Sequence, residues 1–341
     1  MAEETAAESV LAGGPVSRKD GIWVETGALG SYSDVEGREN EILDELKKRP
    51  WLDVVREKYH KSNPWLYSII TDRGRGLFLE MLPLPQEGNF LDVGSGWGQA
   101  AIPLAKRGLS VFCLDISEGR LSVLREIARQ EGVAPACLCG NFLTYPLAAE
   151  RFDGIIFNGS LEWIALGHDG PVRALQEQAL AKAFSLLKPG GLLYIGIENA
   201  LGLKYVLGSP DDHTCLPYVN ILDFDEANAR HRQQRQDRPL RARTWTLADY
   251  RRMLEGAGFA VSEVYGCFPD YKIIRDMVPL SQVNKWLLAG RLNWEEHDNG
   301  LPLACAPLLK PLYKALAANG AAELFCPSYG IAAVKPAGGQ S

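Results

Sequence analysis

The stretch Phe90-Leu91-Asp92-Val93-Gly94-Ser95-Gly96-Trp97-Gly98 decides the fold of this chain. An apolar, strand-like run reaches an acidic residue and then breaks into a Gly-x-Gly-x-Gly turn, and the sequence after the turn is typical of the start of a helix. Glycines in such a turn let the backbone pass close to a ligand. The first N–H groups of the helix are unpaired and suit an anionic group. This layout predicts a site for a nucleoside-bearing cofactor.

The composition is that of an ordinary globular protein. Hydrophobic residues make up 46% of the 341 residues and charged residues 23%, as in soluble domains. The net charge of -6 argues against a general nucleic-acid binder, since duplex affinity comes mainly from cationic contacts with phosphates. No apolar run reaches the roughly 20 residues of a membrane helix, which leaves peripheral membrane association open. Seven scattered cysteines without a Cys-x-x-Cys pair predict neither a zinc site nor a disulfide framework and favour the cytoplasm.

Strand-like and helix-like segments alternate after the quoted stretch. Strands are expected at residues 89–93, 110–115, 136–139, 152–158, 192–198, 259–265 and 329–335. The segments between them have helical spacing of apolar residues. This alternation predicts an α/β fold with a mostly parallel seven-stranded sheet and helices on both of its faces.

The remaining segments predict how the chain is divided. Residues 1–30 lack periodicity and are expected to remain flexible, whereas residues 31–84 are expected to form an N-terminal helical extension. Residues 85–341 then form the main domain, with two insertions. Because ligands of parallel sheets bind at the carboxyl ends of strands, the insertion 199–245 is expected to cap the substrate. The insertion 270–325 is expected to be helical.

The turn and its neighbours discriminate between nucleoside cofactors. In the dinucleotide fingerprint Gly-x-Gly-x-x-Gly the third glycine would occupy the position of Gln99, but here it arrives one position early, at Gly98. Asp115 ends the second strand, where a carboxylate can accept both hydroxyls of a ribose, and residues 187–191 read Leu-Lys-Pro-Gly-Gly. These features resemble the class I S-adenosylmethionine-dependent methyltransferases. The resemblance implies a Rossmann-like fold, methyltransferase activity and S-adenosyl-L-methionine as the cofactor.

The same resemblance implies which residues bind the cofactor. Asn141 and Phe142 stand where the family often has Asp-Phe beside the adenine, and the amide oxygen of Asn141 can still accept the adenine amino group. The implied cofactor residues are Asp92, Gly94, Ser95, Gly96, Trp97, Gly98, Asp115, Ile116, Asn141, Phe142 and Asn158.

A narrower resemblance is carried by five further stretches: Tyr32-Ser33-Asp34 and residues 157–163, 198–205, 211–213 and 268–272. They are similar to methyltransferases encoded with bacterial surface-polysaccharide and O-antigen assembly. Members of that group usually carry Asn-Arg-Leu-Gly where this chain has Asn-Ala-Leu-Gly at 199–202. The resemblance implies O-methylation of a sugar hydroxyl in a surface glycan or its precursor.

A sugar hydroxyl has a high pKa, so its methylation requires a positioned base. His213 is the first candidate because histidine titrates near neutral pH, and Asp212 is expected to orient it or to act itself. The alternative is that residues 211–213 form a polar surface turn. On the acceptor side, Glu162 and Trp163 follow the fourth predicted strand. Glu198 and Asn199 end the fifth predicted strand and are expected to face the acceptor.

Trp163 could present a π face to the sulfonium, or it could pack in the core. An arginine cluster at the end of the cap could bind a phosphate or uronate on the acceptor, or it could be a solvated loop. Its members are Arg230, Arg232, Arg235, Arg238, Arg241 and Arg243.

Other functions remain open at this level. The acceptor could be a small molecule rather than a glycan, or the chain could be a catalytically silent methyltransferase-like interaction protein. A nicotinamide oxidoreductase is disfavoured by the glycine spacing. No metal ligands are predicted, since the sequence carries no ordered metal signature, although Asp211, Asp212 or Asp270 could join a magnesium site. The sequence leaves the oligomeric state open.

Overall fold

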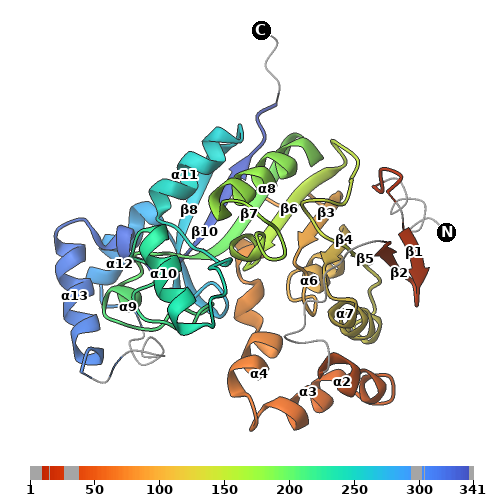
Figure 1. Ribbon diagram of the computed structural model, residues 1–341, viewed down its shortest axis with the longest axis horizontal. Helices are drawn as coiled ribbons and strands as arrows, with labels where there is room; N and C mark the ends of the chain where they lie inside the picture. Colours follow the sequence, from red (N-terminus) through yellow and green to blue (C-terminus); the bar gives the residue numbers. More distant parts are fainter. Residues whose placement is uncertain (1–9, 15, 27–37, 293–301, 303, 338–341) are drawn as a thin grey trace. The chain divides into compact units, whose positions relative to one another are not determined.

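The computed structural model describes residues 10–14, 16–26, 38–292, 302 and 304–337 (Figure 1). The chain divides into two compact units. The first unit comprises the described parts of residues 1–158, 181–194 and 334–341, and the second comprises those of residues 159–180 and 195–333. Strand β7 (Leu187–Glu198) begins in the first unit and ends in the second.

The sheet of the first unit has the strand order β1-β2-β5-β4-β3-β6-β7. Its strands other than β7 are β1 (Val16–Lys19), β2 (Ile22–Glu25), β3 (Asn89–Val93), β4 (Ser110–Asp115), β5 (Ala136–Cys139) and β6 (Phe152–Asn158). Strand β3 pairs in parallel with both β4 and β6. The chain therefore proceeds outward from β3 through β4 to β5 and returns to β6 on the other side of β3. This reversal is the topological switch point at which open α/β sheets bind ligands.

The strand β3 and the helices after it form as the sequence predicts. Phe90 and Leu91 are buried, because a central parallel strand is covered on both faces. Helix α6 (Ala101–Lys106) follows the glycine turn, and helix α7 (Glu118–Gln130) follows β4. The side chain of Ser117 caps α7 by accepting a hydrogen bond from the Arg120 N–H, which satisfies one of the unpaired donors of the helix start.

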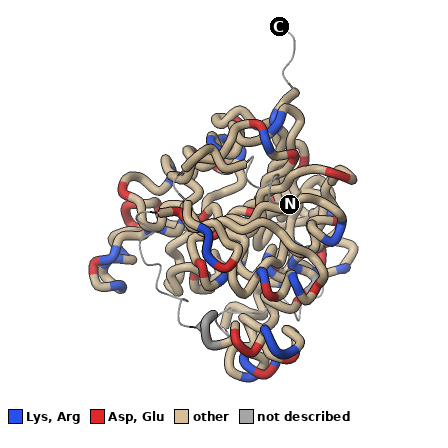
Figure 2. The backbone as a smooth tube through the Cα atoms, turned by 90° about the vertical axis from the view of Figure 1, so that its right-hand side faces the viewer, with Lys and Arg blue, Asp and Glu red and all other residues tan. Residues whose placement is uncertain are grey.

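Helices lie between β2 and β3 in the chain, as expected for the described part of residues 31–84. They are α2 (Arg38–Leu46), α3 (Trp51–Tyr59), α4 (Pro64–Thr71), the 3-10 turn η1 (Arg73–Gly76) and α5 (Phe78–Met81). The Trp51 indole donates a hydrogen bond to Glu131, and the Trp51 N–H donates one to Gln130. These two contacts anchor α3 to the end of α7. Acidic and basic residues are interspersed along the chain (Figure 2), as in the ion pairs of Arg49 with Glu45 and Glu57.

The expectation that residues 1–30 remain flexible is wrong for residues 16–25, which form the antiparallel hairpin β1–β2. Asp20 and Gly21 connect the strands, and both have positive φ angles, of 47° and 77°. Asp-Gly is the sequence that favours such a two-residue turn. Ile22 and Trp23 are buried, and β2 extends the sheet by pairing in parallel with β5. The stretch Tyr32-Ser33-Asp34 lies outside the described residues.

The sheet of the second unit has the order β7-β10-β8-β9, where β8 is Ala260–Pro269, β9 is Ile274–Pro279 and β10 is Ser328–Val334. The insertion 270–325 was expected to be helical, but it begins with β9, which pairs antiparallel with β8. The buried Ile274 and Val278 reach the core through this pairing, which local periodicity does not reveal. The expected helices follow as η3 (Leu280–Gln282), α12 (Val283–Leu288), α13 (Ala306–Ala318) and η5 (Ala322–Phe325).

Further helices complete the second unit. The insertion 199–245 contains α9 (Leu203–Val206) and α10 (Phe224–Gln234), and α11 (Leu247–Gly256) starts at a capping box formed by Thr246 and Asp249. Helix α8 (Val172–Leu186) is followed directly by β7, which starts at Leu187 rather than at residue 192.

All seven predicted strands are present, and the α/β, Rossmann-like fold class is confirmed; β1, β2 and β9 are additional strands. In the part of the chain that the structure describes, no helix is both long and apolar enough to span a membrane.

Candidate functional site

The glycine turn after β3 is held by backbone geometry. Gly94, Gly96 and Gly98 have φ angles of 73°, 53° and 89°, which side chains other than hydrogen rarely allow. A Cβ atom on Gly98 would lie 2.9 Å from Ile102 and 3.0 Å from Leu124, so this glycine lets the two helices pack closely. A Cβ atom on Gly96 would meet only the side-chain oxygen of Gln99, at 3.7 Å. The backbone at Gly96 is therefore open to a ligand.

Asp115, the predicted ribose ligand, faces this turn. One of its carboxylate oxygens accepts the Gly96 N–H at 2.9 Å, and the other accepts the Ser117 N–H at 2.9 Å. Asp115 is 3% exposed. Each carboxylate oxygen can accept a second hydrogen bond, so the carboxylate can hold the turn and still accept ribose hydroxyls. The ribose contact stays a prediction.

The first unit also contains buried polar atoms that have no hydrogen-bond partner, on Asp92, Asn158 and Arg75. Asp92 Oδ2, Asn158 Oδ1 and the Arg75 atoms Nε and Nη1 are buried and unbonded. Burial and the nearby charge of Asp115 raise the pKa of Asp92 to about 7, although the positive charge of Arg75 acts to lower it. Buried polar atoms normally have partners, so these atoms mark a place for a polar ligand.

Arg75 was missed by sequence reasoning. It lies in the 3-10 turn η1, between Gly74 and Gly76. An arginine flanked by glycines before the first predicted strand is a weak signal, and only the fold brings its charge to bear on Asp92.

Other predicted cofactor residues have protein partners. The Asn141 side-chain oxygen accepts the Leu143 N–H at 2.9 Å, so it forms a local turn instead of being left free for adenine. The ring of Phe142 is buried edge-to-face against Phe157, 5.3 Å away. The ring of Trp97 lies 6.0 Å from Tyr59. Ile116 is half-buried. Cofactor contacts of these residues stay predictions.

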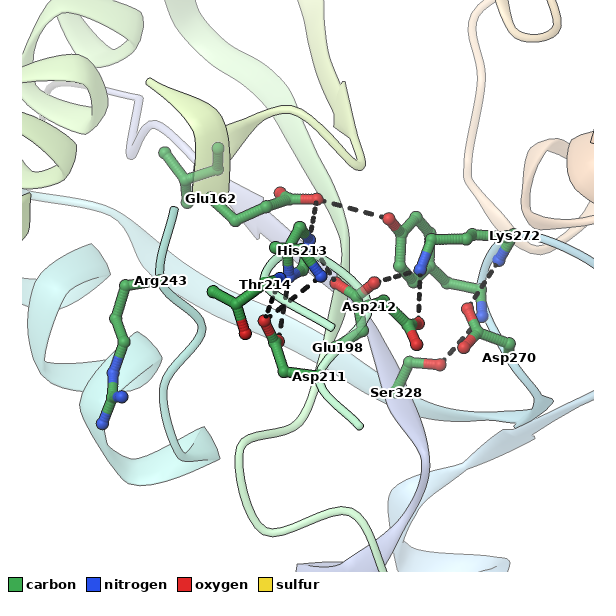
Figure 3. Close-up of polar contacts among 12 residues, drawn as sticks. Glu162, Glu198, Asp211, Asp212, His213, Thr214, Arg243, Asp270, Lys272 and Ser328 are labelled. Carbon is green, nitrogen blue, oxygen red and sulfur yellow. Dashed lines mark hydrogen bonds and ion pairs between the residues drawn. The ribbon is translucent and has the colours of Figure 1, made fainter. Parts of the chain in front are cut away.

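A second cluster of polar side chains lies within the second unit (Figure 3). Nε2 of His213 is 3.5 Å from Glu162 Oε1 and 3.7 Å from Glu198 Oε2. The side chains of both glutamates are 0% exposed and that of His213 is 3% exposed. The backbone explains why the glutamates are fixed, since Glu162 lies in the 3-10 turn η2 (Leu161–Trp163) and Glu198 ends β7. Residues 211–213 are therefore no solvated surface turn.

Asp211, rather than the predicted Asp212, orients the imidazole. Nδ1 of His213 lies 3.1 Å from Asp211 Oδ1. The second oxygen of Asp211 accepts the backbone N–H groups of His213 and Thr214. Because a carboxylate only accepts, the ring hydrogen is on Nδ1 and the lone pair of a neutral ring is on Nε2. Asp212 instead forms ion pairs with Lys204, at 3.4 Å, and Lys272, at 2.8 Å.

Two lysines and a tyrosine complete the cluster. Lys272 forms ion pairs with Glu198 and Asp212, and Lys204 forms ion pairs with Asp212 and Asp270. The Tyr271 hydroxyl donates to Glu162 Oε1 at 3.3 Å. Sequence reasoning assigned no role to either lysine or to this tyrosine, although all three lie in the stretches 198–205 and 268–272, which carry the narrower resemblance.

The charges shift several pKa values in this cluster. Burial alone would lower the pKa of His213, but Glu198, Asp211 and Glu162 raise it well above its usual value. Burial raises the pKa of Glu198, an effect that Lys272 opposes. Burial would also raise the pKa of Asp212, but Lys272 and Lys204 hold it well below its usual range. Asp212 is thus ionised and poorly suited to accept a proton.

Trp163 and Asn199 have different environments. The Trp163 ring lies edge-on to the His213 ring, with centroids 5.0 Å apart. The Asn199 amide donates to the Leu324 and Cys326 carbonyls and to the Tyr329 hydroxyl. The Asn199 amide nitrogen therefore holds the segment at the start of β10. This role conflicts with the expectation that Asn199 faces the acceptor.

Most arginines of the cap bind backbone carbonyls. Arg243 donates to Val219 and Leu222, and Arg241 donates to the carbonyls of residues 165, 168 and 170. Arg235 donates to Thr214. Arg232 donates to the carbonyl and to the carboxylate of Asp237. The predicted anion site therefore loses four of its six members.

Comparison with known proteins finds similarity over the central part of the chain. A family model described as a methyltransferase domain matches residues 91–195. The ubiquinone biosynthesis O-methyltransferase of Parvibaculum lavamentivorans is 29% identical over 161 residues, which are 44% of this chain and 60% of that protein. The tRNA 5-carboxymethoxyuridine methyltransferase of Escherichia coli is 33% identical over 122 residues, 35% of this chain and 43% of that protein. The chain thus spans about half the length of these curated relatives.

Among solved structures, phosphoethanolamine N-methyltransferase 2 of Haemonchus contortus with S-adenosyl-L-methionine aligns at a TM-score of 0.42 and 18% identity, covering 77% of this chain and 52% of that one.

Proposed function

We propose that this chain, in which residues 91–195 form a class I S-adenosylmethionine-dependent methyltransferase domain, methylates a sugar hydroxyl of a surface glycan or its precursor. The domain makes the chain a methyltransferase and S-adenosylmethionine its cofactor. The acceptor is the part that we propose. The observation that carries it is the buried group of Glu162, Glu198 and His213, which offers carboxylate oxygens as acceptors for the proton of a hydroxyl.

The residues around the glycine turn fit this cofactor. Asp92 and Asn158 offer unbonded oxygens to amino or hydroxyl donors, and Arg75 offers unbonded N–H groups to a carboxylate. The open backbone at Gly96 leaves room for a close approach. S-adenosylmethionine supplies an electrophilic methyl group on a sulfonium sulfur.

The chemistry of a hydroxyl acceptor requires a group that takes its proton. As the new oxygen–carbon bond forms, the sulfur–carbon bond breaks, and the products are a methyl ether, S-adenosylhomocysteine and one proton. A positioned acid–base group contributes about 10²–10⁴-fold to such a step. We assign this proton to the two buried glutamates, because the raised pKa of His213 keeps its ring protonated near neutral pH. Asp211 directs Nε2 of that ring toward both glutamates. In sequence, Glu162 follows the end of β6 and Glu198 is the last residue of β7. Parallel sheets bind ligands at the carboxyl ends of their strands.

Three features support the acceptor class and the location. The stretches that resemble surface-polysaccharide methyltransferases include residues 157–163, 198–205 and 211–213, which supply the whole His213 group. One of the relatives is named an O-methyltransferase. All seven cysteines are free, which supports a reducing, cytoplasmic location, where nucleotide- and lipid-linked sugars would be accessible.

The test is transfer of label from methyl-labelled S-adenosylmethionine by the purified full chain. The acceptors are a panel of nucleotide sugars, lipid-linked glycans and small phenolic and aglycone hydroxyls, with bulk tRNA as a further arm. We expect label in a sugar acceptor, in a product whose methyl group resists alkaline hydrolysis because it is an ether. Label in the small-molecule arm alone moves the acceptor to that class. Label in tRNA alone, or an alkali-labile ester, contradicts the proposal.

A further inference from the structure

We propose that Glu162, Glu198 and His213 bind one divalent metal ion of the Mn²⁺ and Mg²⁺ class. One ligand atom from each residue lies within 4.8 Å of the other two. With metal–ligand bonds of about 2.1 Å, two ligand atoms at right angles lie about 3 Å apart and two opposite atoms about 4.2 Å apart. The distances of Nε2 from the two carboxylate oxygens, 3.5 Å and 3.7 Å, fall within that range.

The second observation is that one oxygen of each carboxylate lacks a hydrogen-bond partner. Oε2 of Glu162 and Oε2 of Glu198 have no hydrogen-bond partner, although both side chains are completely buried. A buried, unbonded carboxylate oxygen is costly unless a cation or a donor satisfies it. Oε2 of Glu198 is the same atom that faces His213. The unbonded oxygen therefore points at the position where the ion would bind.

His213 is oriented as a metal ligand. Metal-binding histidines usually donate their other ring N–H to a carboxylate, which fixes the ring and its tautomer. Asp211 provides that carboxylate at 3.1 Å from Nδ1, and it is itself held by the Thr214 N–H at 2.7 Å. The ring of Trp163 packs edge-on against the imidazole. These contacts leave Nε2 free to coordinate.

The charge of the cluster also favours a cation. In the described part of the chain it holds five carboxylates, those of Glu162, Glu198, Asp211, Asp212 and Asp270, against two lysines. The lysine ion pairs are with the two aspartates at 212 and 270 and with Glu198, whereas the ion pair of Glu162 is with His213. A divalent ion between these two residues balances the excess of negative charge.

The donor set selects the kind of ion. Two carboxylates suit Mg²⁺ and Mn²⁺, and an imidazole favours the transition metal of the two. Three protein ligands leave positions free for water or a substrate oxygen. The role of the ion in catalysis rests on the proposed function: an acceptor hydroxyl bound to the ion would have a lowered pKa. Its proton would pass to the unbonded Oε2 of Glu162, while His213 holds the ion.

Calorimetric titration of MnCl₂ into the full chain, after removal of metal with EDTA, tests the binding. We expect one Mn²⁺ per chain, with affinity lowered at least about 10- to 100-fold in Glu162→Gln and Glu198→Gln. The matched control is Glu226→Gln, at an exposed position of α10 in the same unit, which should bind Mn²⁺ as the wild type does. No binding by the wild type at millimolar Mn²⁺, or equal affinities in folded variants, would overturn the proposal.

A spectroscopic test avoids dependence on the folding of variants. Electron spin echo spectroscopy of Mn²⁺ bound to the wild type should show a directly coordinated imidazole nitrogen, and His213→Gln should abolish that signal. Bound Mn²⁺ without a nitrogen signal would contradict the assigned ligands.

The acceptor panel in EDTA separates this proposal from the proposed function. Ether formation that is unaffected by EDTA, in a chain that binds no Mn²⁺, removes the metal site and leaves the function. Specific Mn²⁺ binding without methylation of any hydroxyl leaves the metal site and removes the proposed function.

Discussion

The glycine turn of the first unit and the His213 group of the second are built in different ways. The turn is one short segment, and its main partner, Asp115, ends the neighbouring strand β4. The His213 group draws its side chains from η2, the end of β7 and the insertion 199–245. Local sequence is therefore enough to recognise the first site, whereas the second exists only after folding.

The two regions also differ in how their charges are satisfied. Both oxygens of Asp115 accept backbone N–H groups, so this carboxylate is a structural part of the turn. In the other group, two buried glutamates each keep an unbonded oxygen, and the unbonded oxygen of Glu198 lies 3.7 Å from Nε2 of His213. The glycine turn would therefore hold a ligand mainly through its preformed backbone. The His213 group would instead act through side chains that can accept a proton or bind a cation. Variants in the two regions should therefore affect different measurements.

The largest effect is expected from His213→Gln. Loss of Nε2 removes the proposed metal ligand and the ring that faces the two proton-accepting glutamates, so turnover should fall by about 10²–10⁴-fold. Steady-state kinetics with the sugar acceptor measures this fall. The comparison breaks down if turnover stays near normal, because the group would then have no part in the chemistry.

Asp115→Ala should act on the other site. Removal of the carboxylate frees the Gly96 and Ser117 N–H groups and removes the expected ribose ligand. Binding of S-adenosylmethionine should weaken by about 1–3 kcal/mol, the usual cost of buried groups left unpaired. Calorimetry measures this loss, and circular dichroism controls for folding. An unchanged affinity would show that Asp115 does not contact the ribose.

A pH dependence of about tenfold per unit is expected from Asp92. Its pKa is raised to about 7, so the carboxylate is charged above pH 7 and becomes neutral below it. Affinity for the cationic cofactor should therefore fall as the pH decreases from about 7 toward 5, with a limiting slope of one proton. Asp92→Asn should bind more weakly and lose this pH dependence. A wild-type affinity that is constant over this range would contradict the assignment.

The smallest effects should distinguish two neighbours in the cap. Asp211→Asn removes the carboxylate that orients His213, and turnover should fall about tenfold or more, as for other groups that orient a ligand. Asp212→Asn removes only a partner of two lysines, so we expect a smaller fall. The measurement is kcat at saturating acceptor. A larger fall in kcat for Asp212→Asn than for Asp211→Asn would show that Asp212 is the orienting residue.

The sequence could predict the turn because its signals are local. Glycines at positions 94, 96 and 98 predict a turn with positive φ angles, and a serine at position 117 predicts the start of α7. The hairpin β1–β2 could also have been found, since Asp20-Gly21 is a turn signal between short strand-like runs. By contrast, β9 forms through its pairing with β8, which no periodicity in its own residues reveals.

The His213 group could be predicted only in part. The sequence proposes His213, Glu162 and Glu198 separately, but not that they meet. It also cannot choose between Asp211 and Asp212, because the choice depends on which carboxylate the turn directs at the ring. Asn199 shows the opposite failure: its position after β7 suggests a substrate ligand, yet tertiary hydrogen bonds to the segment 324–329 use its amide completely.

The most direct test of this account is titration of S-adenosylhomocysteine into the wild type, Asp115→Ala and His213→Gln under the same conditions. The account predicts one site in the wild type, weaker binding in Asp115→Ala and wild-type affinity in His213→Gln, since only the glycine turn holds the cofactor. Absence of binding to the wild type, or equal losses in both variants, would contradict it.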